Sequence, residues 1–251
     1  MTKEEKRLFI LKYLTCTCRD DGKVITDDLK FRRLEELLTK TNSSYHLVKA
    51  GNLFRLYGRV PVETSDNIVV ISTHADIVND ITKPWVSLEK PVLKGTFDNS
   101  AGDACAAILM YENKLPDNVF IAFTMNEEYG MKGAKAVNRY FKRIGKDFTA
   151  ITLDVTYEGY EEHADYSIEN IFFNKDTVAK VSEALKVTQG KRVVTPRGLP
   201  DEAWVYGSEK RQSCSVCVPT KGAMHSNSGL NMRSESFMRY VDAVKNIASS
   251  I

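Results

Sequence analysis

Short apolar runs alternate along the chain with longer stretches in which apolar residues recur every three or four positions. The short runs predict strands at 44–50, 52–60, 67–73, 118–124, 148–155 and 213–218. The longer spacing predicts helices at 27–40, 100–113, 131–144, 175–188 and 234–249. This alternation predicts an α/β three-layer sandwich in which a central mixed, mostly parallel β-sheet is flanked by helices.

The chain shows no feature that would divide it into separate domains. It contains no internal repeat, no low-complexity tract and no Pro/Gly/Ser-rich linker. Its 251 residues, 43% of them hydrophobic, are enough to bury a full core. We therefore expect one catalytic domain over residues 1–251.

The N-terminal segment MTKEEKRLFILKYL carries charges every few residues and has the apolar spacing of an amphipathic helix, not of a signal peptide. No run approaches the roughly 18 apolar residues that a membrane-spanning helix needs. We expect a cytoplasmic protein without a membrane contact. The 35 basic and 33 acidic residues leave a net charge of +2, which gives no electrostatic reason to expect nucleic acid as a partner.

Five cysteines, an odd number in apolar surroundings, do not form a disulfide framework. Cys214 and Cys217 form a C-x-x-C motif, which can indicate a metal site or a redox pair. The surrounding SCSVCV is strand-like, however, and residues three apart on a strand face opposite sides of the sheet. Buried structural thiols are the better interpretation.

Ionisable side chains follow the predicted strands at their carboxyl ends, where α/β sheets carry their chemistry. The run IAFTMN ends in two adjacent glutamates, which would repel each other and are costly to bury without a positive charge nearby. Similar groups follow the other strands and precede one helix: His74, Asp76, Asp98, Glu127, Glu128, Asp154 and His225.

Each of these residues has an ordinary explanation when it is taken alone. An H-x-D pair is a weak signal, adjacent glutamates are common on surfaces, Asp98 could cap the following helix and Asp154 could begin a turn. Together, however, they would place at least four carboxylates at one edge of one sheet without neutralisation. Bound metal is the simplest explanation for such a cluster.

The number of ligands predicts two divalent metal ions. A catalytic Zn²⁺ commonly takes three protein ligands, so two ions that share one carboxylate need two histidines and three carboxylates. The set that meets this need is His74, Asp98, Glu128, Asp154 and His225. Zn²⁺ is the first expectation, and Co²⁺ or Mn²⁺ would suit the same ligands.

Two acidic residues beside this set are candidates for catalysis. Glu127 is left as a free carboxylate next to the metals, which is the natural position of a general base. Asp76 lies two positions after His74 and could hold its other ring nitrogen.

The ordered motifs HAD, GTFDNSAG, NEEYG, LDVT and AMHS resemble those of the co-catalytic dinuclear zinc aminopeptidases. LDVT and MHS are most similar to the glutamyl aminopeptidase/endoglucanase-M branch. The resemblance implies that His74 and Asp154 hold one ion, that Glu128 and His225 hold the other, and that Asp98 bridges them.

The same resemblance implies further details of the site. Glu127 would be the base, Asp76 would orient a ligand, and the peptide bond between Asp98 and Asn99 would be cis. The segment LPDEAW resembles one that reads TDA in that branch, which would make Asp201 a substrate-binding residue. Capping of a short helix is the alternative for Asp201.

The chain departs from this branch in its length between two motifs. The branch carries a lid or oligomerisation domain between the H-x-D motif and the bridging aspartate, whereas Asp76 and Asp98 are only 22 positions apart. The dimerisation insert of the related deacylases is not expected either. We therefore expect no inserted lid or dimerisation domain, and a monomer or small homo-oligomer.

Three functions are compatible with these residues. The first is an aminopeptidase that removes N-terminal residues from peptides, with a metal-bridging water activated by Glu127. The second is a metal-dependent deacylase or amidohydrolase acting on a small amide at the same site. The third, a non-catalytic binding protein, is disfavoured because every ligand and the base are present.

Overall fold

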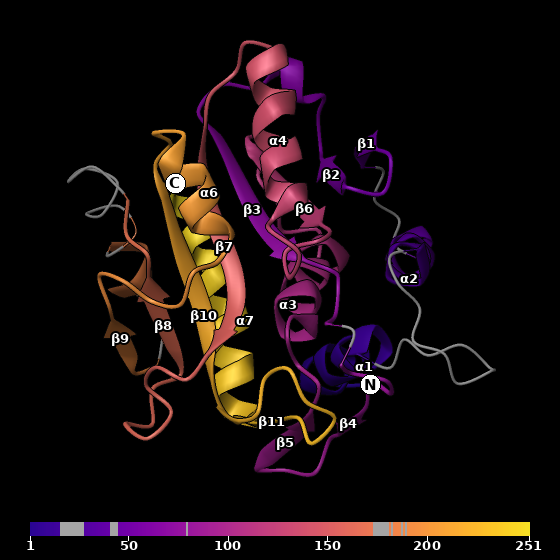
Figure 1. Ribbon diagram of the computed structural model, residues 1–251, viewed down its shortest axis with the longest axis vertical. Coiled ribbons are helices and arrows are strands. Elements are labelled where there is room, and N and C mark those ends of the chain that lie inside the picture. The colour runs from indigo at the N-terminus through magenta and orange to yellow at the C-terminus, as the bar shows by residue number, and fades with distance from the viewer. Residues whose placement is uncertain are drawn as a thin grey trace.

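The computed structural model describes residues 1–15, 28–40, 45–78, 80–172, 181, 183–186, 188 and 190–251. Figure 1 shows a central sheet with helices on both faces. This is the α/β sandwich predicted from the sequence. Among the described residues, none of the helices combines the length and apolarity needed to cross a membrane.

The described part of the chain forms an 11-stranded mixed sheet with the order β1-β2-β6-β3-β7-β10-β11-β5-β4, and β8 and β9 extend it beside β10. The strands are β1 (His46–Ala50), β2 (Phe54–Gly58), β3 (Ile68–His74), β4 (Val86–Ser87), β5 (Val92–Gly95), β6 (Val119–Thr124), β7 (Phe148–Thr156), β8 (Tyr166–Glu169), β9 (Arg192–Val194), β10 (Ser213–Gly222) and β11 (Leu230–Arg233).

The parallel part of the sheet lies at its centre. Strands β6, β3, β7 and β10 run parallel to one another, whereas β1, β2, β11, β5 and β4 pair antiparallel at the two sides. The register pairs His74 with Thr124 and Asp154 with Cys217. The carboxyl ends of the central strands therefore meet at one edge, and residues that follow them gather there.

Helices form a layer on each face of the sheet. The elements are α1 (Lys3–Thr15), α2 (Asp28–Thr39), η1 (Val62–Thr64), α3 (Ser100–Tyr111), α4 (Lys132–Arg143), α6 (Glu202–Ser208) and α7 (Ser234–Ser250). Helices α3 and α7 cover one face, with α1 and α2 packed outside α3, and α4 and α6 cover the other. In Figure 1, α6 lies in front of β10 and α7 lies behind it.

The composition of each helix matches its position. Helix α3 (SAGDACAAILMY) is made largely of small or apolar residues and is buried along nearly its whole length, because it lies between the sheet and α1. Helix α4 is amphipathic: Ala134, Val137 and Phe141 are buried, whereas Lys142 and Arg143 are exposed in the last turn. Basic side chains there also suit the negative end of the helix dipole.

The predicted strands and helices agree with the structure to within a few residues, apart from those that fall on undescribed positions. Of the predicted helix 175–188, the described residues 181 and 183–186 are helical and residue 188 is not. The other positions of that prediction lie outside the described residues, as do positions 27 and 44, Cys16 and Cys18. The other thiols, Cys105, Cys214 and Cys217, are free and buried, which confirms the structural interpretation for them.

Candidate metal centre

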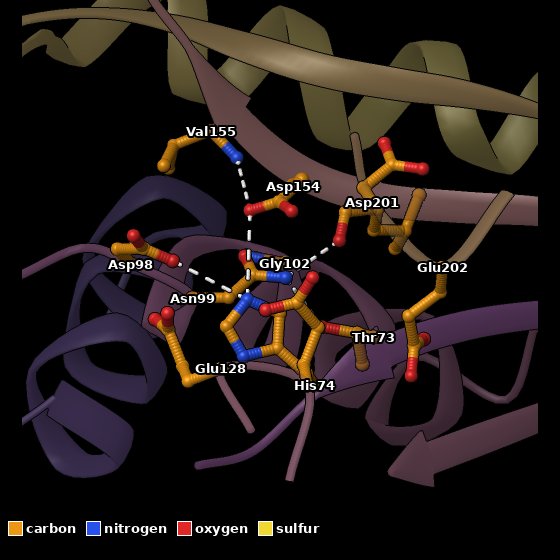
Figure 2. A network of polar contacts seen from close by, with 12 residues as sticks. Thr73, His74, Asp98, Asn99, Gly102, Glu128, Asp154, Val155, Asp201 and Glu202 are labelled. Carbon is orange, nitrogen blue, oxygen red and sulfur yellow. Dashed lines mark hydrogen bonds and ion pairs between the residues drawn. The ribbon is translucent and has the colours of Figure 1, made fainter. Parts of the chain in front are cut away.

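All seven ionisable residues selected from the strand ends and the helix-preceding turn lie in one region of the structure. His74 is the last residue of β3 and Asp154 lies near the end of β7. The glutamate pair follows β6, Asp98 precedes α3, and His225 lies in the loop after β10. Figure 2 shows His74 among Asp98, Glu128 and Asp154.

The two oxygens of Asp98 face two different imidazoles. Asp98 Oδ1 lies 3.3 Å from His74 Nε2, and Asp98 Oδ2 lies 3.2 Å from His225 Nε2. Asp154 Oδ1 is 3.8 Å from His74 Nε2, and Glu128 Oε2 is 3.3 Å from His225 Nε2. Asp98 thus lies between a His74–Asp154 pair and a His225–Glu128 pair.

Three groups of ligand atoms in the described chain are compact enough to hold an ion, with every atom of a group within 4.8 Å of the others. Two of the groups share Asp98, and the third joins His74 to both glutamates. The groups are His74–Asp98–Asp154, Asp98–Glu128–His225 and His74–Glu127–Glu128.

An unpaired carboxylate oxygen indicates that the site is built for a further positive group. Glu128 Oε1 is buried without a hydrogen-bond partner among the described residues. A buried polar atom that lacks a partner is costly, and such atoms in native proteins often mark an ion or a functional role. Imidazole and carboxylate donors suit Zn²⁺, Co²⁺ and Mn²⁺, so the residues present fit divalent ions.

The pKa values of the carboxylic acids reflect their crowding. Burial raises the pKa of Glu127 to about 8. Burial and the nearby Asp98 charge raise the pKa of Glu128 to about 7, and burial outweighs the hydrogen bond from His74 to raise the pKa of Asp154 to about 7. Without a cation these acids compete for protons, whereas a divalent ion would favour their charged forms.

At Asp98 and His225, in contrast, the neighbouring groups favour the charged form of the side chain. Burial acts to raise the pKa of Asp98, but hydrogen bonds from His225 and His74 outweigh it and hold that pKa well below its usual range. The hydrogen bond to Asp98 raises the pKa of His225 to about 9. These hydrogen bonds favour the charged forms of Asp98 and His225.

Asp76 contacts both His74 and the glutamate loop. Its Oδ1 lies 3.5 Å from His74 Nδ1. The same carboxylate accepts the backbone N–H of Glu127 at Oδ1 (3.2 Å) and of Glu128 at Oδ2 (3.3 Å). One side chain therefore links the end of β3 to the loop after β6, a contact that the sequence pattern did not reveal.

The peptide bond between Asp98 and Asn99 is cis, as the family resemblance predicted. The alternative explanation of Asp98 as a helix cap is wrong, because Asn99 is the N-cap of α3 and its side chain accepts the N–H of Gly102. The carboxylate of Asp98 is therefore free to face the histidines. In the sequence DNS, the residue that caps the helix is Asn99, one position after Asp98.

Asp201 lies next to this region, at the start of α6 (Figure 2). Its Oδ1 accepts the N–H of Ala203 at 2.7 Å, which confirms the capping alternative, and its Oδ2 accepts the hydroxyl of Ser215. A contact with substrate stays a prediction. Burial raises the pKa of Asp201 to about 6.

Glu202 is a buried acid that sequence reasoning missed. It is fully buried, its Oε2 accepts the hydroxyl of Ser72 at 2.6 Å, and its Oε1 accepts the hydroxyl of Thr124. Burial raises its pKa to about 7. The side chain joins α6 to β3 and β6 close to the site. No sequence signal marked it, because acidic residues are common in the first turn of helices.

Comparisons with known proteins identify the fold. Scans against protein-family models and curated proteins give no match. Among solved structures, a TET aminopeptidase from the marine sediment archaeon Thaumarchaeota archaeon SCGC AB-539-E09 matches with a TM-score of 0.75 and 12% identity, over 98% of this chain and 96% of that chain. Aminopeptidase APDkam598 from Desulfurococcus kamchatkensis matches with a TM-score of 0.73 and 13% identity, over 100% and 96%. The TET1 peptidase of Pyrococcus horikoshii matches with a TM-score of 0.70 and 14% identity, over 98% and 99%.

These matches show that the chain shares the fold of aminopeptidases. TET aminopeptidases and a protein described as a putative peptidase/endoglucanase are among the structures it resembles.

Proposed function

We propose that this chain is a metal-dependent aminopeptidase with a centre for two divalent ions. The observation that carries the proposal is the position of Asp98, whose two oxygens lie 3.3 Å from His74 Nε2 and 3.2 Å from His225 Nε2. A carboxylate that faces two ligand groups at once suits a bridge between two ions. His74 and Asp154 would hold one ion, and Glu128 and His225 the other.

Ions bound there, Zn²⁺ first and Co²⁺ or Mn²⁺ as alternatives, would supply Lewis acidity that polarises a peptide carbonyl and makes water more acidic. Glu127 lies outside the two groups that share Asp98. We assign its carboxylate to accept a proton from the attacking water and to deliver it to the leaving amine nitrogen. Asp76 holds both the imidazole of His74 and the backbone of the glutamate loop in place.

The substrate is proposed to be a peptide with a free N-terminus, since the structures of similar fold are aminopeptidases. The alternative is a deacylase or amidohydrolase, which would use the same centre on a small amide. A non-catalytic binding protein is less favoured, because the candidate ligands and the candidate base all lie together.

One experiment separates the two enzyme functions. The metal-loaded chain is offered free-amine peptides and the same peptides with an N-acetyl group, across a panel of N-terminal residues. An aminopeptidase releases the first residue only from the free amines, whereas a deacylase releases acetate from the blocked peptides. Glu127→Gln serves as the control, because any hydrolysis that this variant retains does not depend on the proposed base.

We also propose that residues 1–251 form one catalytic domain and that the chain is a monomer or small homo-oligomer. The support is the short connection between β3 and β5, in which the described residues form only the two-residue strand β4 and loops. A cytoplasmic location stays a prediction from the sequence.

A further inference from the structure

The two histidines of the metal centre have very different surroundings. The side chain of His74 is 2% exposed at the end of a central strand, whereas the side chain of His225 is 55% exposed. His225 lies in the loop 223–229 that joins β10 to β11. An exposed ligand on a loop keeps its position only if other contacts hold that loop.

Asn227, two positions after His225, binds a separate segment of the chain through its side chain. Its Oδ1 accepts the N–H of Thr82 at 3.0 Å and the N–H of Lys83 at 3.4 Å. Its Nδ2 donates to the carbonyl oxygen of Asp80 at 3.1 Å. One amide group therefore pairs with three backbone groups of the segment 80–83, which lies between β3 and β4.

The backbone around Asn227 is held as well. The indole Nε1 of Trp85 donates to the carbonyl oxygen of Asn227 at 2.8 Å. Gly229 has a φ of +70°, and a Cβ there would lie 2.6 Å from the carbonyl oxygen of Gly95. The loop thus lies directly against the β4–β5 hairpin, at a distance that only glycine permits.

A second contact holds the other side of His225. The hydroxyl of Tyr157, just after β7, accepts the N–H of Met224 at 3.2 Å. His225 therefore lies between two anchored positions, Met224 and Asn227. The Asn227 anchor is the more extensive, because five hydrogen bonds of 3.4 Å or less join Asn227 to segment 80–85.

We propose that Asn227 is a positioning residue for the exposed half of the metal centre. By fixing loop 223–229 to segment 80–85, it holds His225 at the distance from Asp98 and Glu128 that a second ion needs. The buried half, formed by His74, Asp98 and Asp154, does not depend on this contact. The part of the inference that concerns ions rests on the proposed function.

The test titrates Zn²⁺ alone, and Co²⁺ alone, into the metal-free full-length chain and follows uptake by calorimetry and by the absorption of Co²⁺. In Asn227→Ala the second ion should bind about 10- to 100-fold more weakly, the usual effect of removing a group that orients a ligand, while the first ion binds as in the wild type. Tyr157→Phe should weaken the second ion in the same direction. Asn231→Ala is the matched control, because among the described residues the side chain of Asn231 bonds only the carbonyl of Lys221, within the same hairpin.

Hydrogen exchange of the metal-free proteins gives a readout that does not depend on ions or activity. In Asn227→Ala, the backbone amides of residues 223–229 should lose protection from exchange. Its melting temperature should equal that of Asn231→Ala. Equal protection of this loop in Asn227→Ala and wild type overturns the inference, as does equal weakening of both ions. A wild-type chain that takes up no ion overturns the proposed function instead, while the exchange data still decide whether Asn227 holds the loop.

Discussion

The side-chain amide of Asn99 donates a hydrogen bond to the carbonyl oxygen of Leu153 at 2.6 Å. It also donates to Thr73 Oγ1 at 3.1 Å, and its Oδ1 accepts the N–H of Gly102. Leu153 precedes Asp154, Thr73 precedes His74, and Asn99 follows Asp98. One buried side chain therefore sets the spacing of the three segments that carry the buried group of candidate ligands (Figure 2).

Asn99→Ala should destabilise the fold by about 2–4 kcal/mol, because it removes three buried hydrogen bonds, to Leu153, Thr73 and Gly102. Denaturant unfolding of the metal-free chain measures this effect. The matched control is Asn118→Ala, a partly exposed residue whose side chain bonds only the carbonyl of Asn67 among the described residues, and it should change stability by less than about 0.5 kcal/mol. Equal losses in the two variants would show that Asn99 has no special structural role.

Gly102→Ala should destabilise the protein, although the same exchange usually stabilises a helix by up to about 1 kcal/mol. A Cβ at position 102 would lie 2.5 Å from Asn99 Oδ1 and 2.7 Å from Thr73 Oγ1. We expect a loss of about 1–3 kcal/mol, as for other overpacked positions. The double variant with Asn99→Ala should lose less than the sum of the single losses, because one of the two side chains that clash is gone. A stabilised Gly102→Ala would refute this account.

Glu127→Gln and Glu128→Gln should have different effects. Gln keeps the size of Glu but accepts no proton, so Glu127→Gln should lower kcat by about 10²- to 10⁴-fold while the ions remain bound. Glu128→Gln should weaken ion binding, since Glu128 Oε2 lies 3.3 Å from His225 Nε2 in a candidate ion group. Steady-state kinetics with elemental analysis of each variant tests the assignment, which fails if the two variants behave alike.

Bound metal should stabilise the fold as well as support catalysis. Two buried acids of the candidate ligand set, Glu128 and Asp154, have pKa values raised to about 7, so a bound cation would relieve the cost of their charges. An ion present at 100 times its Kd adds about 2.7 kcal/mol per site. The melting temperature should therefore be lower with a chelator than without it. Elemental analysis should find up to two ions per chain. A metal-replete protein that contains no ion would contradict the prediction.

The sequence predicted the longer strands of this protein better than the short ones. Strands β3, β6 and β7 are apolar runs followed by ionisable residues, so both their existence and the gathering of His74 and Asp154 could be read from the pattern. The short strands β4, β5, β8, β9 and β11 were not predicted, because two to four residues are too few to show an alternation. Their pairing depends on neighbours that are distant in the sequence.

The supporting contacts of the site were beyond the sequence for the same reason. Asp76 bonds residues 51 and 52 positions away, and Glu202 bonds Ser72 from 130 positions away. Spacing along a chain indicates which residues follow strands, but it does not indicate which backbone groups a side chain will meet across the sheet. The positions of Asn99 and Asn227 are therefore results of the structure.

The last prediction concerns assembly. One matched structure is described as a dodecamer, and Pyrococcus horikoshii TET1 is described as assembling into a tetrahedron or a large octahedral shell. In this chain the connection between β3 and β5 is short, and its described residues contact the chain itself: Trp85 donates to Asn227, and Asp80 and Thr82 bond the same residue. With only 17 residues between β3 and β5, this segment is too short to form an inserted domain that could build a closed shell.

We therefore expect a monomer or small oligomer with a comparatively open site, limited to small substrates by the residues around the metal centre. Multi-angle light scattering, run with and without divalent ions, measures the mass directly. Ions are included because ordering of loop 223–229 could change the adjoining surface. A particle near twelve times the 28.3 kDa chain mass in either condition would contradict the prediction and would require contacts outside segment 75–91.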